Sequence, residues 1–219
     1  MALTRDELLD TAGVTYTNAA EPGIGGRIAP AGFDEQWRLA GLERTTSLQT
    51  KITQQQNAKG EQHNLTQILQ DAQAVRRGEL IELKQAVRTA DTISPPAEGS
   101  YYTRLNLKGA TPRGHASLVA FARTVYSAIL EQPDLLQAIS GLGYTQEQIE
   151  ALLQGIAGLE TLNARQEKAK GDYQALTQEV KALEKALWAD LSALKKVIKA
   201  LFSGEEESQV LATLQLTRL

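Results

Sequence analysis

Residues 171–201 read GDYQALTQEVKALEKALWADLSALKKVIKAL, and this stretch decides the fold class. Its large apolar side chains recur at steps of three or four residues, which is the spacing of one helix face. The face consists of Tyr173, Leu176, Val180, Leu183, Leu187, Leu191, Leu194, Ile198 and Leu201. The spacing predicts a long helix with a coiled-coil seam, in which one extra residue is inserted near Leu187.

The composition of the whole chain points in the same direction. The 219 residues are 42% hydrophobic but only 5% aromatic, and 20 of them are glutamine, which favours helices over sheets. A net charge of −3 gives no basic footprint, so we expect no nucleic-acid partner. The absence of cysteine excludes disulfides, thiolate nucleophiles and zinc–thiolate sites.

Nothing in the sequence predicts membrane insertion or secretion. Residues 1–10 lack the charged-then-apolar pattern of a signal peptide, and no apolar run reaches the length of a membrane span. We therefore expect a cytoplasmic protein without a membrane span.

The chain resembles itself when it is shifted by 111 residues. The tetrapeptide at residues 58–61, AKGE, then meets AKGD at residues 169–172, and LTQ at residues 65–67 meets LTQ at residues 176–178. Leu80, Leu83 and Lys84 fall on Leu191, Leu194 and Lys195, and over residues 32–90 the two copies agree at 15 of 59 positions. We interpret this as an internal duplication, which predicts that the two copies have the same architecture. The alternative is that two amphipathic helices share a composition and a chance offset.

Two structures of each copy compete. In one, Gly60 and Gly171 end one helix and begin a turn, so that each copy is a helical hairpin and the two hairpins form a four-helix bundle. In the other, the helix runs through the glycine and each copy is one rod. The polar stretches at residues 53–64 and 163–172 favour the hairpin, whereas the heptad phase that Gln166, Ala169 and Tyr173 keep across the glycine favours the rod. The prediction is the hairpin bundle, all-α and pseudo-symmetric.

The remaining segments complete a single helical domain over residues 1–219. Thr4 and Glu7 form a capping box that opens a short helix ending near Gly13, and the glycine-rich residues 21–27 leave the rest of the arm irregular. Residues 101–108 and 14–17 alternate weakly, which predicts a covering loop or, as the alternative, a two-stranded ribbon. The segments are an N-terminal arm (1–31), a first helical repeat (32–90), a Pro/Gly-rich loop (91–114), connecting helices (115–142) and a second helical repeat (143–219).

A search for catalytic, cofactor-binding or metal-binding residues assigns none. His63 and His115 lack the Glu-x-x-His spacing of a bundle metal site. The acidic pair Glu79 and Glu82 and the run at residues 205–207 are typical of solvated helix faces and helix ends. Residues 21–27 lack the flanking strand and the Lys-Ser/Thr of a phosphate loop. Trp37 and Trp188 are interpreted as core or interface residues.

Five lysines give the last long helix a basic face: Lys181, Lys185, Lys195, Lys196 and Lys199. The acidic neighbours Glu179, Glu184 and Asp190 dilute this charge, so a solvated surface is the expectation and a partner-binding or lipid-binding face the alternative.

The second half of the chain resembles a loosely defined set of bacterial proteins without assigned function. The residues that carry the resemblance are the AKGD motif at residues 169–172, Trp188 and the closing segment 207–214, which lacks the proline common there. The resemblance implies helical architecture and a bacterial source, and it transfers no catalytic residues.

These observations favour a non-enzymatic structural or protein-interaction role, with a protein partner or self-association. The alternative is a small-molecule-binding or enzymatic bundle with an internal pocket.

Overall fold

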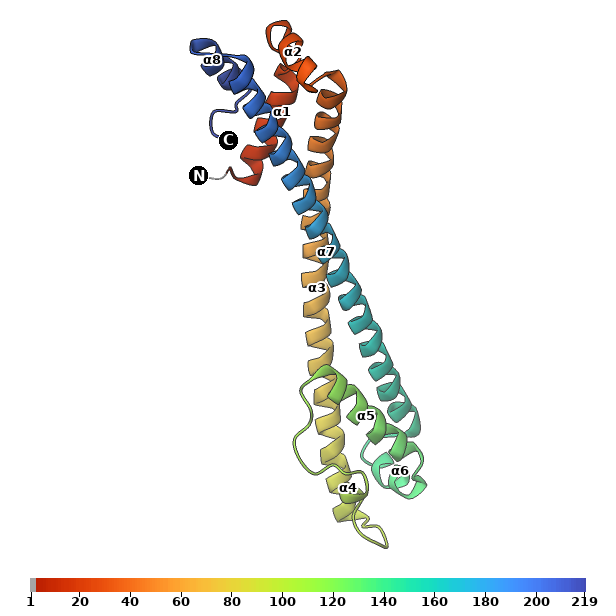
Figure 1. Cartoon of the computed structure of the whole chain (residues 1–219). Coiled ribbons are helices and arrows are strands. Elements are labelled where there is room, and N and C mark those ends of the chain that lie inside the picture. The colour runs from red at the N-terminus through yellow and green to blue at the C-terminus, as the bar shows by residue number, and fades with distance from the viewer. Residues whose placement is uncertain (1–2) are drawn as a thin grey trace. The chain divides into compact units, whose positions relative to one another are not determined.

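The computed structural model describes residues 3–219, and in that range the protein is α-helical without a strand (Figure 1). The all-α prediction is confirmed. The helices are α1 (Arg5–Asn18), α2 (Pro22–Ile28), a 3₁₀ turn (Ala29–Ala31), α3 (Glu35–Ile93), α4 (Tyr101–Arg104), α5 (His115–Leu130), α6 (Pro133–Ser140), α7 (Gln146–Leu201) and α8 (Glu205–Thr213).

Two of these helices are long and uninterrupted, which corrects the hairpin prediction. Gly60 lies inside the 59 residues of α3 and Gly171 inside the 56 residues of α7, and neither has a positive φ. Each copy is therefore a rod, and the four-helix hairpin bundle is wrong. A single glycine costs a helix about 1 kcal/mol, which the packing of a long apolar seam exceeds.

The N-terminal arm is more regular than predicted. The capping box of Thr4 and Glu7 opens α1 as expected, but the helix continues past Gly13 to Asn18. The glycine-rich stretch forms α2, which has Pro22 at its first position, where a missing N–H costs nothing. The prediction that this stretch is irregular is wrong, because the buried Ile24 and Ile28 anchor it to the core.

The Pro/Gly-rich loop begins later than predicted, because residues 91–93 still belong to α3; the rest of it contains one short helix and no strand. Residues 101–104 form α4, while residues 14–17 lie inside α1, so the ribbon alternative is wrong. Residues 115–142 hold the two helices α5 and α6, where the sequence predicts connecting helices.

The chain divides into two compact units. Unit 1 comprises the chain up to Gly60 and Gly171–Leu219, and unit 2 comprises Glu61–Lys170. Each unit contains the N-terminal half of one long helix, the C-terminal half of the other, and shorter helices that cover them.

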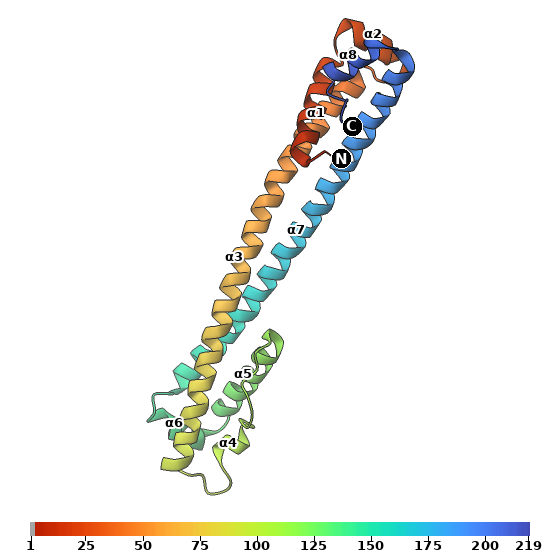
Figure 2. The same cartoon turned by 90° about the vertical axis from the view of Figure 1, so that its left-hand side faces the viewer.

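The core of unit 1 is formed by α1, α2, α8 and their halves of α3 and α7 (Figure 2). Leu187, Leu191, Leu194 and Ile198 of the predicted seam are fully buried in it. Residues 214–219, which follow α8, are held against α1, because the Thr15 hydroxyl donates to the Leu214 carbonyl at 2.7 Å.

The core of unit 2 is formed by α4, α5, α6 and the other halves of the long helices. Ile149, Ile156 and Leu159 of α7 are buried here, as are Leu80, Leu83 and Val87 of α3.

Helix boundaries recur at the offset seen in the sequence. The starts of α3 and α7, at Glu35 and Gln146, are 111 residues apart, and so are the starts of α2 and α6, at Pro22 and Pro133. Helix α1 coincides with α5 at the same offset to within one residue at each end.

Specific contacts recur as well. In unit 1 the Gln55 amide donates to the Thr177 hydroxyl at 2.8 Å, and in unit 2 Gln166 donates to Thr66 at 3.3 Å. Each residue of the first pair lies 111 positions from its counterpart in the second. The glycines that precede the long helices, Gly32 and Gly143, also match, with φ values of +92° and +93°.

Candidate functional site

The solvent side of α7 in unit 1 carries a row of exposed lysines. Lys181, Lys185, Lys196 and Lys199 are exposed, and with 3.6 residues per turn they share one face, opposite the buried seam. We call these four residues the basic face. No ion pair joins any of them to another residue in the described range 3–219.

The acidic residues of this half of α7 do not lie on the basic face. Glu184 pairs with Arg5 of α1, Asp190 pairs with Arg44 of α3, and Glu179 pairs with Lys51 of α3 at 2.6 Å. The prediction that these three residues dilute the basic charge is therefore wrong. Their charges are matched by cations of the neighbouring helices, and the positive charge of the basic face is left uncompensated.

A strip of small side chains lies beside the basic face. It consists of Ala182, Ala189, Ala193 and Ala200, all of which are exposed. Alanine lets another backbone approach closely, and it buries no polar group when it is covered. Lysines flank the strip along one side.

Lys195, the fifth lysine of the predicted series, has a different role. Its ammonium donates to the Leu219 carbonyl at 2.7 Å and to the Thr217 carbonyl at 3.4 Å. Burial lowers the pKa of Lys195, and the nearby charge of Lys199 lowers it further. Lys195 thus holds residues 217–219 against α7 and does not belong to the basic face.

The counterpart of Lys195 in unit 2 is Lys84, which lies 111 positions earlier. It is also partnered by a loop carbonyl, that of Gly109 at 2.9 Å. The identity that the sequence shows at these two positions therefore corresponds to the same local structure.

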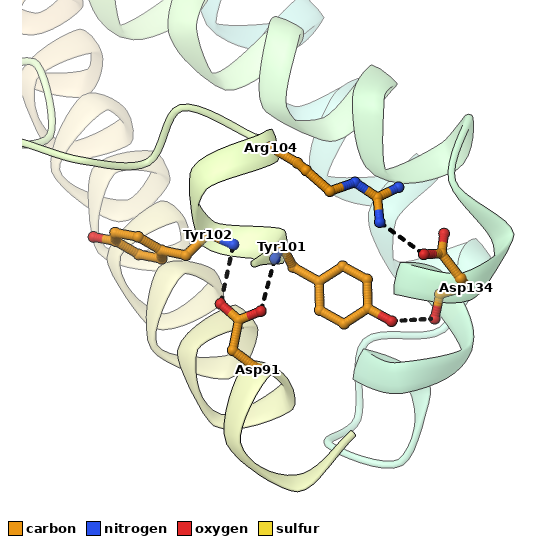
Figure 3. Close-up of polar contacts among 5 residues, drawn as sticks. All are labelled: Asp91, Tyr101, Tyr102, Arg104 and Asp134. Carbon is orange, nitrogen blue, oxygen red and sulfur yellow. Dashed lines mark hydrogen bonds and ion pairs between the residues drawn. The ribbon is translucent and has the colours of Figure 1, made fainter. Parts of the chain in front are cut away.

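A polar network secures the loop of unit 2 (Figure 3). The Asp91 carboxylate accepts from the backbone N–H groups of Tyr101 at 2.7 Å and Tyr102 at 3.1 Å, and so satisfies the first two donors of α4, whose N-cap is Ser100. Arg104 pairs with Asp134 at 2.8 Å, and the hydrogen bond from Arg104 lowers the pKa of that carboxyl. Burial, and next the charge of Asp134, raise the pKa of Tyr101. Each of these groups already has a structural partner, so the network serves to hold the loop in place.

The remaining residues singled out in the sequence are dispersed. His63 is exposed on α3, whereas His115 begins α5, where its Nδ1 lies 3.0 Å from the Gln73 amide nitrogen. No group of three or more acidic, histidine or cysteine side chains within residues 3–219 has the arrangement of a metal site.

The acidic residues considered for acid–base work lie at helix surfaces. Glu79 pairs with Arg76 at 2.7 Å, while Glu82 is exposed. The run Glu205, Glu206 and Glu207 forms the first turn of α8, where negative charge is favourable, and Glu206 pairs with Arg27 at 2.6 Å.

Both tryptophans pack against the core of unit 1 and are half-buried. The Trp37 ring lies 4.8 Å from that of Tyr16 and 4.9 Å from that of Phe33, measured between centroids. Trp188 lies on α7 between the seam and the basic face.

Cavities bear on the alternative of a small-molecule site. One open cavity in unit 2, about 610 Å³ in volume, is lined in part by Ile93, Tyr101, Asp134 and Leu142. A smaller cavity of about 170 Å³ lies beside Lys84. Both are lined mainly by residues larger than alanine and glycine, whereas a cavity of about 300 Å³ in unit 1 is lined mainly by alanines and glycines.

The sequence did not predict that Glu179, Glu184 and Asp190 pair with cations of the neighbouring helices. Arg5, Arg44 and Lys51 lie more than 120 residues before their partners in α7, so local sequence does not show the pairs. The helical spacing alone gives a partial signal, since Glu179 and Asp190 lie away from the lysines on a helical wheel.

No protein-family model matches the chain, and comparisons with curated proteins and with solved structures also give no match. Within residues 3–219, no helix combines the length and the apolarity that crossing a bilayer requires.

Proposed function

We propose that this protein is a non-enzymatic interaction protein that binds an acidic helix of a protein partner along the basic face of α7. The observation that carries the proposal is the inward pairing of Glu179, Glu184 and Asp190. That pairing leaves four exposed lysines on one helix face without a matching negative charge.

The chemistry of the face favours a helical partner. The strip Ala182, Ala189, Ala193 and Ala200 allows another helix to approach closely, and the lysines beside it would pair with acidic side chains at that helix's edge. Such charge complementarity speeds association and fixes the register of the two helices.

Two other polyanions fit the face less well. A membrane-bound helix needs large apolar side chains to insert, but Leu187, Leu191 and Leu194 of this half of α7 are buried in the core of unit 1, and the exposed Leu201 lies at the end of the helix. A nucleic-acid surface is usually rich in arginine and stacking aromatics, and the four residues of the basic face are all lysine.

We also infer that the chain is an internal duplication in which each copy includes its preceding short helices. The inference rests on the shared offset of α1 with α5, α2 with α6 and α3 with α7. It rests further on the buried positions that coincide at this offset, including Leu80 with Leu191 and Val87 with Ile198. The proposal keeps a cytoplasmic location and a bacterial source as expectations of the sequence.

The binding proposal is tested with a synthetic amphipathic peptide made of Glu, Ala and Leu, and with a scrambled peptide of the same composition. The test variant replaces the basic face: Lys181→Gln, Lys185→Gln, Lys196→Gln and Lys199→Gln. A control variant removes the same charge from exposed positions elsewhere: Lys59→Gln, Lys108→Gln, Lys168→Gln and Arg113→Gln.

We expect the native protein and the control variant to bind the amphipathic peptide at low salt, and the test variant to bind it at least about tenfold more weakly. Equal binding of the scrambled peptide, or an equal loss in both variants, would contradict the proposal. Tighter binding to anionic vesicles or to a single-stranded oligonucleotide would replace the protein partner by that ligand. Light scattering of the protein alone, at low and high salt, identifies a second copy as the partner if the test variant loses a dimer.

A further inference from the structure

Lys84 is a buried cation in unit 2. The residue is 8% exposed, and its ammonium donates to the Gly109 carbonyl at 2.9 Å. Gly109 has a φ of +102°, which favours glycine. The same ammonium lies 6.0 Å from the ring centroid of Tyr102 and 5.9 Å from that of Phe121.

A second cation lies one helical turn further along α3. The Arg88 guanidinium sits 4.4 Å above the ring centroid of Tyr102 and donates to the hydroxyl of that residue at 2.7 Å. Across residues 3–219, no carboxylate lies within ion-pairing distance of Lys84 or Arg88. Asp91, three residues after Arg88, is committed to the backbone N–H groups that begin α4.

This arrangement leaves Lys84 short of both acceptors and negative charge. An ammonium has three N–H donors, and the Gly109 carbonyl is the one hydrogen-bond acceptor that the described residues give it. In unit 1 the equivalent Lys195 has two carbonyl acceptors and is less deeply buried. An anion that reaches Lys84 therefore meets an ammonium that no carboxylate neutralises, and a charge-assisted hydrogen bond to it is favourable.

The space for such an anion is present. A cavity of about 170 Å³ is lined by Lys84, Arg88, Tyr102, Gly109, Thr111 and Ile81, among others. A water molecule occupies about 30 Å³ of liquid, so the cavity has room for a small anion and its hydration. The buried Thr111 adds a hydroxyl to the lining, which can donate to an oxyanion.

We propose that this cavity binds a small oxyanion, a phosphate or carboxylate group, between the Lys84 ammonium and the Arg88 guanidinium. The site lies wholly within unit 2 and does not depend on the basic face of α7 in unit 1. The two proposals are therefore independent, and a result against one does not contradict the other.

The test is the thermal stability of the full chain in inorganic phosphate, acetate or chloride at matched ionic strength. An anion that binds the folded state raises the Tm, and for a chain of this size a tenfold excess over Kd gives a rise of about 3–6 °C. We expect phosphate or acetate to give this rise relative to chloride. The anion with the larger effect identifies the group: phosphate for a tetrahedral oxyanion, acetate for a carboxylate.

Three variants locate the effect. Lys84→Met removes the buried charge and also the contact with Gly109, so this variant tests folding as well as binding. Arg88→Gln leaves that contact in place, and we expect it to weaken anion binding at least about fivefold by calorimetry. Arg113→Gln changes an exposed cation in the same loop and serves as the matched control.

An equal rise in Tm for the native protein and Arg88→Gln would overturn the proposal, because the anion would then act elsewhere. The absence of any rise over chloride up to high millimolar phosphate and acetate would overturn it as well. A rise with phosphate that Lys84→Met and Arg88→Gln both retain would overturn it too, because it would be a general effect of an excluded salt on the folded state.

Discussion

At the scale of single residues, the packing of unit 1 depends on the absence of a side chain at Gly41. A Cβ atom there would lie 2.1 Å from Cε1 of Tyr16, far inside van der Waals contact. Tyr16 is fully buried, and its hydroxyl donates to Asp190 at 3.3 Å. We expect Gly41→Ala to lower the free energy of unfolding by about 1–3 kcal/mol, measured by urea denaturation, because the ring must move.

The matched control is Gly13→Ala in α1. Gly13 also lies inside a helix, but a Cβ atom there meets nothing within 4 Å. This change should leave stability equal or raise it by up to about 1 kcal/mol, since alanine is the better helix former. Equal effects of the two substitutions would show that the Tyr16 ring yields to Gly41→Ala without cost. Local sequence does not single out Gly41, because the ring that it accommodates comes from another helix.

At the scale of elements, the interior glycines of the long helices make a prediction of definite sign. Gly171 has helical φ and ψ, and an added Cβ atom there meets nothing within 4 Å. Gly171→Ala should therefore raise the free energy of unfolding by up to about 1 kcal/mol, seen as a higher urea midpoint with an unchanged m-value. Gly60→Ala in α3 should behave in the same way. A destabilising Gly171→Ala would mean that the helix ends at this residue in solution, as the hairpin prediction had it.

Sequence reasoning predicted the elements best where local chemistry decides them. The capping box at Thr4 and Glu7 corresponds to the start of α1, and the connecting helices predicted over residues 115–142 correspond to α5 and α6. It failed for α2, whose helix is stabilised by the burial of Ile24 and Ile28 rather than by its glycine-rich sequence. For the long helices the decisive signal was the heptad phase across Gly171, and the polar stretch around it misled the prediction, because a long helix tolerates solvated turns.

At the scale of the whole molecule, the sequence predicted the helical class and the 111-residue offset, but not the pairing of charges. The offset recurs in the helix starts, and buried positions such as Leu48 and Leu159 coincide at it. The basic face of α7 is recognised only once Arg5, Arg44 and Lys51 are placed in space, because these cations neutralise the acidic residues of the helix and leave the lysines uncompensated.

The last prediction concerns the number of cooperative units. Contacts divide the chain into two units, yet α3 and α7 each run unbroken through the boundary at Gly60 and Gly171. If one unit unfolded, each long helix would gain a newly exposed end, and half of its apolar seam would be uncovered. Because helix formation is cooperative, such partial unfolding is unfavourable. We therefore expect the two units to unfold together, in one transition, as a single domain.

Two spectroscopic probes separate the possibilities. Trp37 and Trp188, the two tryptophans of the chain, both lie in unit 1, so their fluorescence follows that unit, whereas circular dichroism at 222 nm follows helix in both. Coincident urea transitions are the expected result, and Gly41→Ala should lower both midpoints equally. If Gly41→Ala shifts the fluorescence transition and leaves part of the dichroism signal at its original midpoint, unit 2 is stable without unit 1. The continuous helices would then connect two domains without coupling their stability.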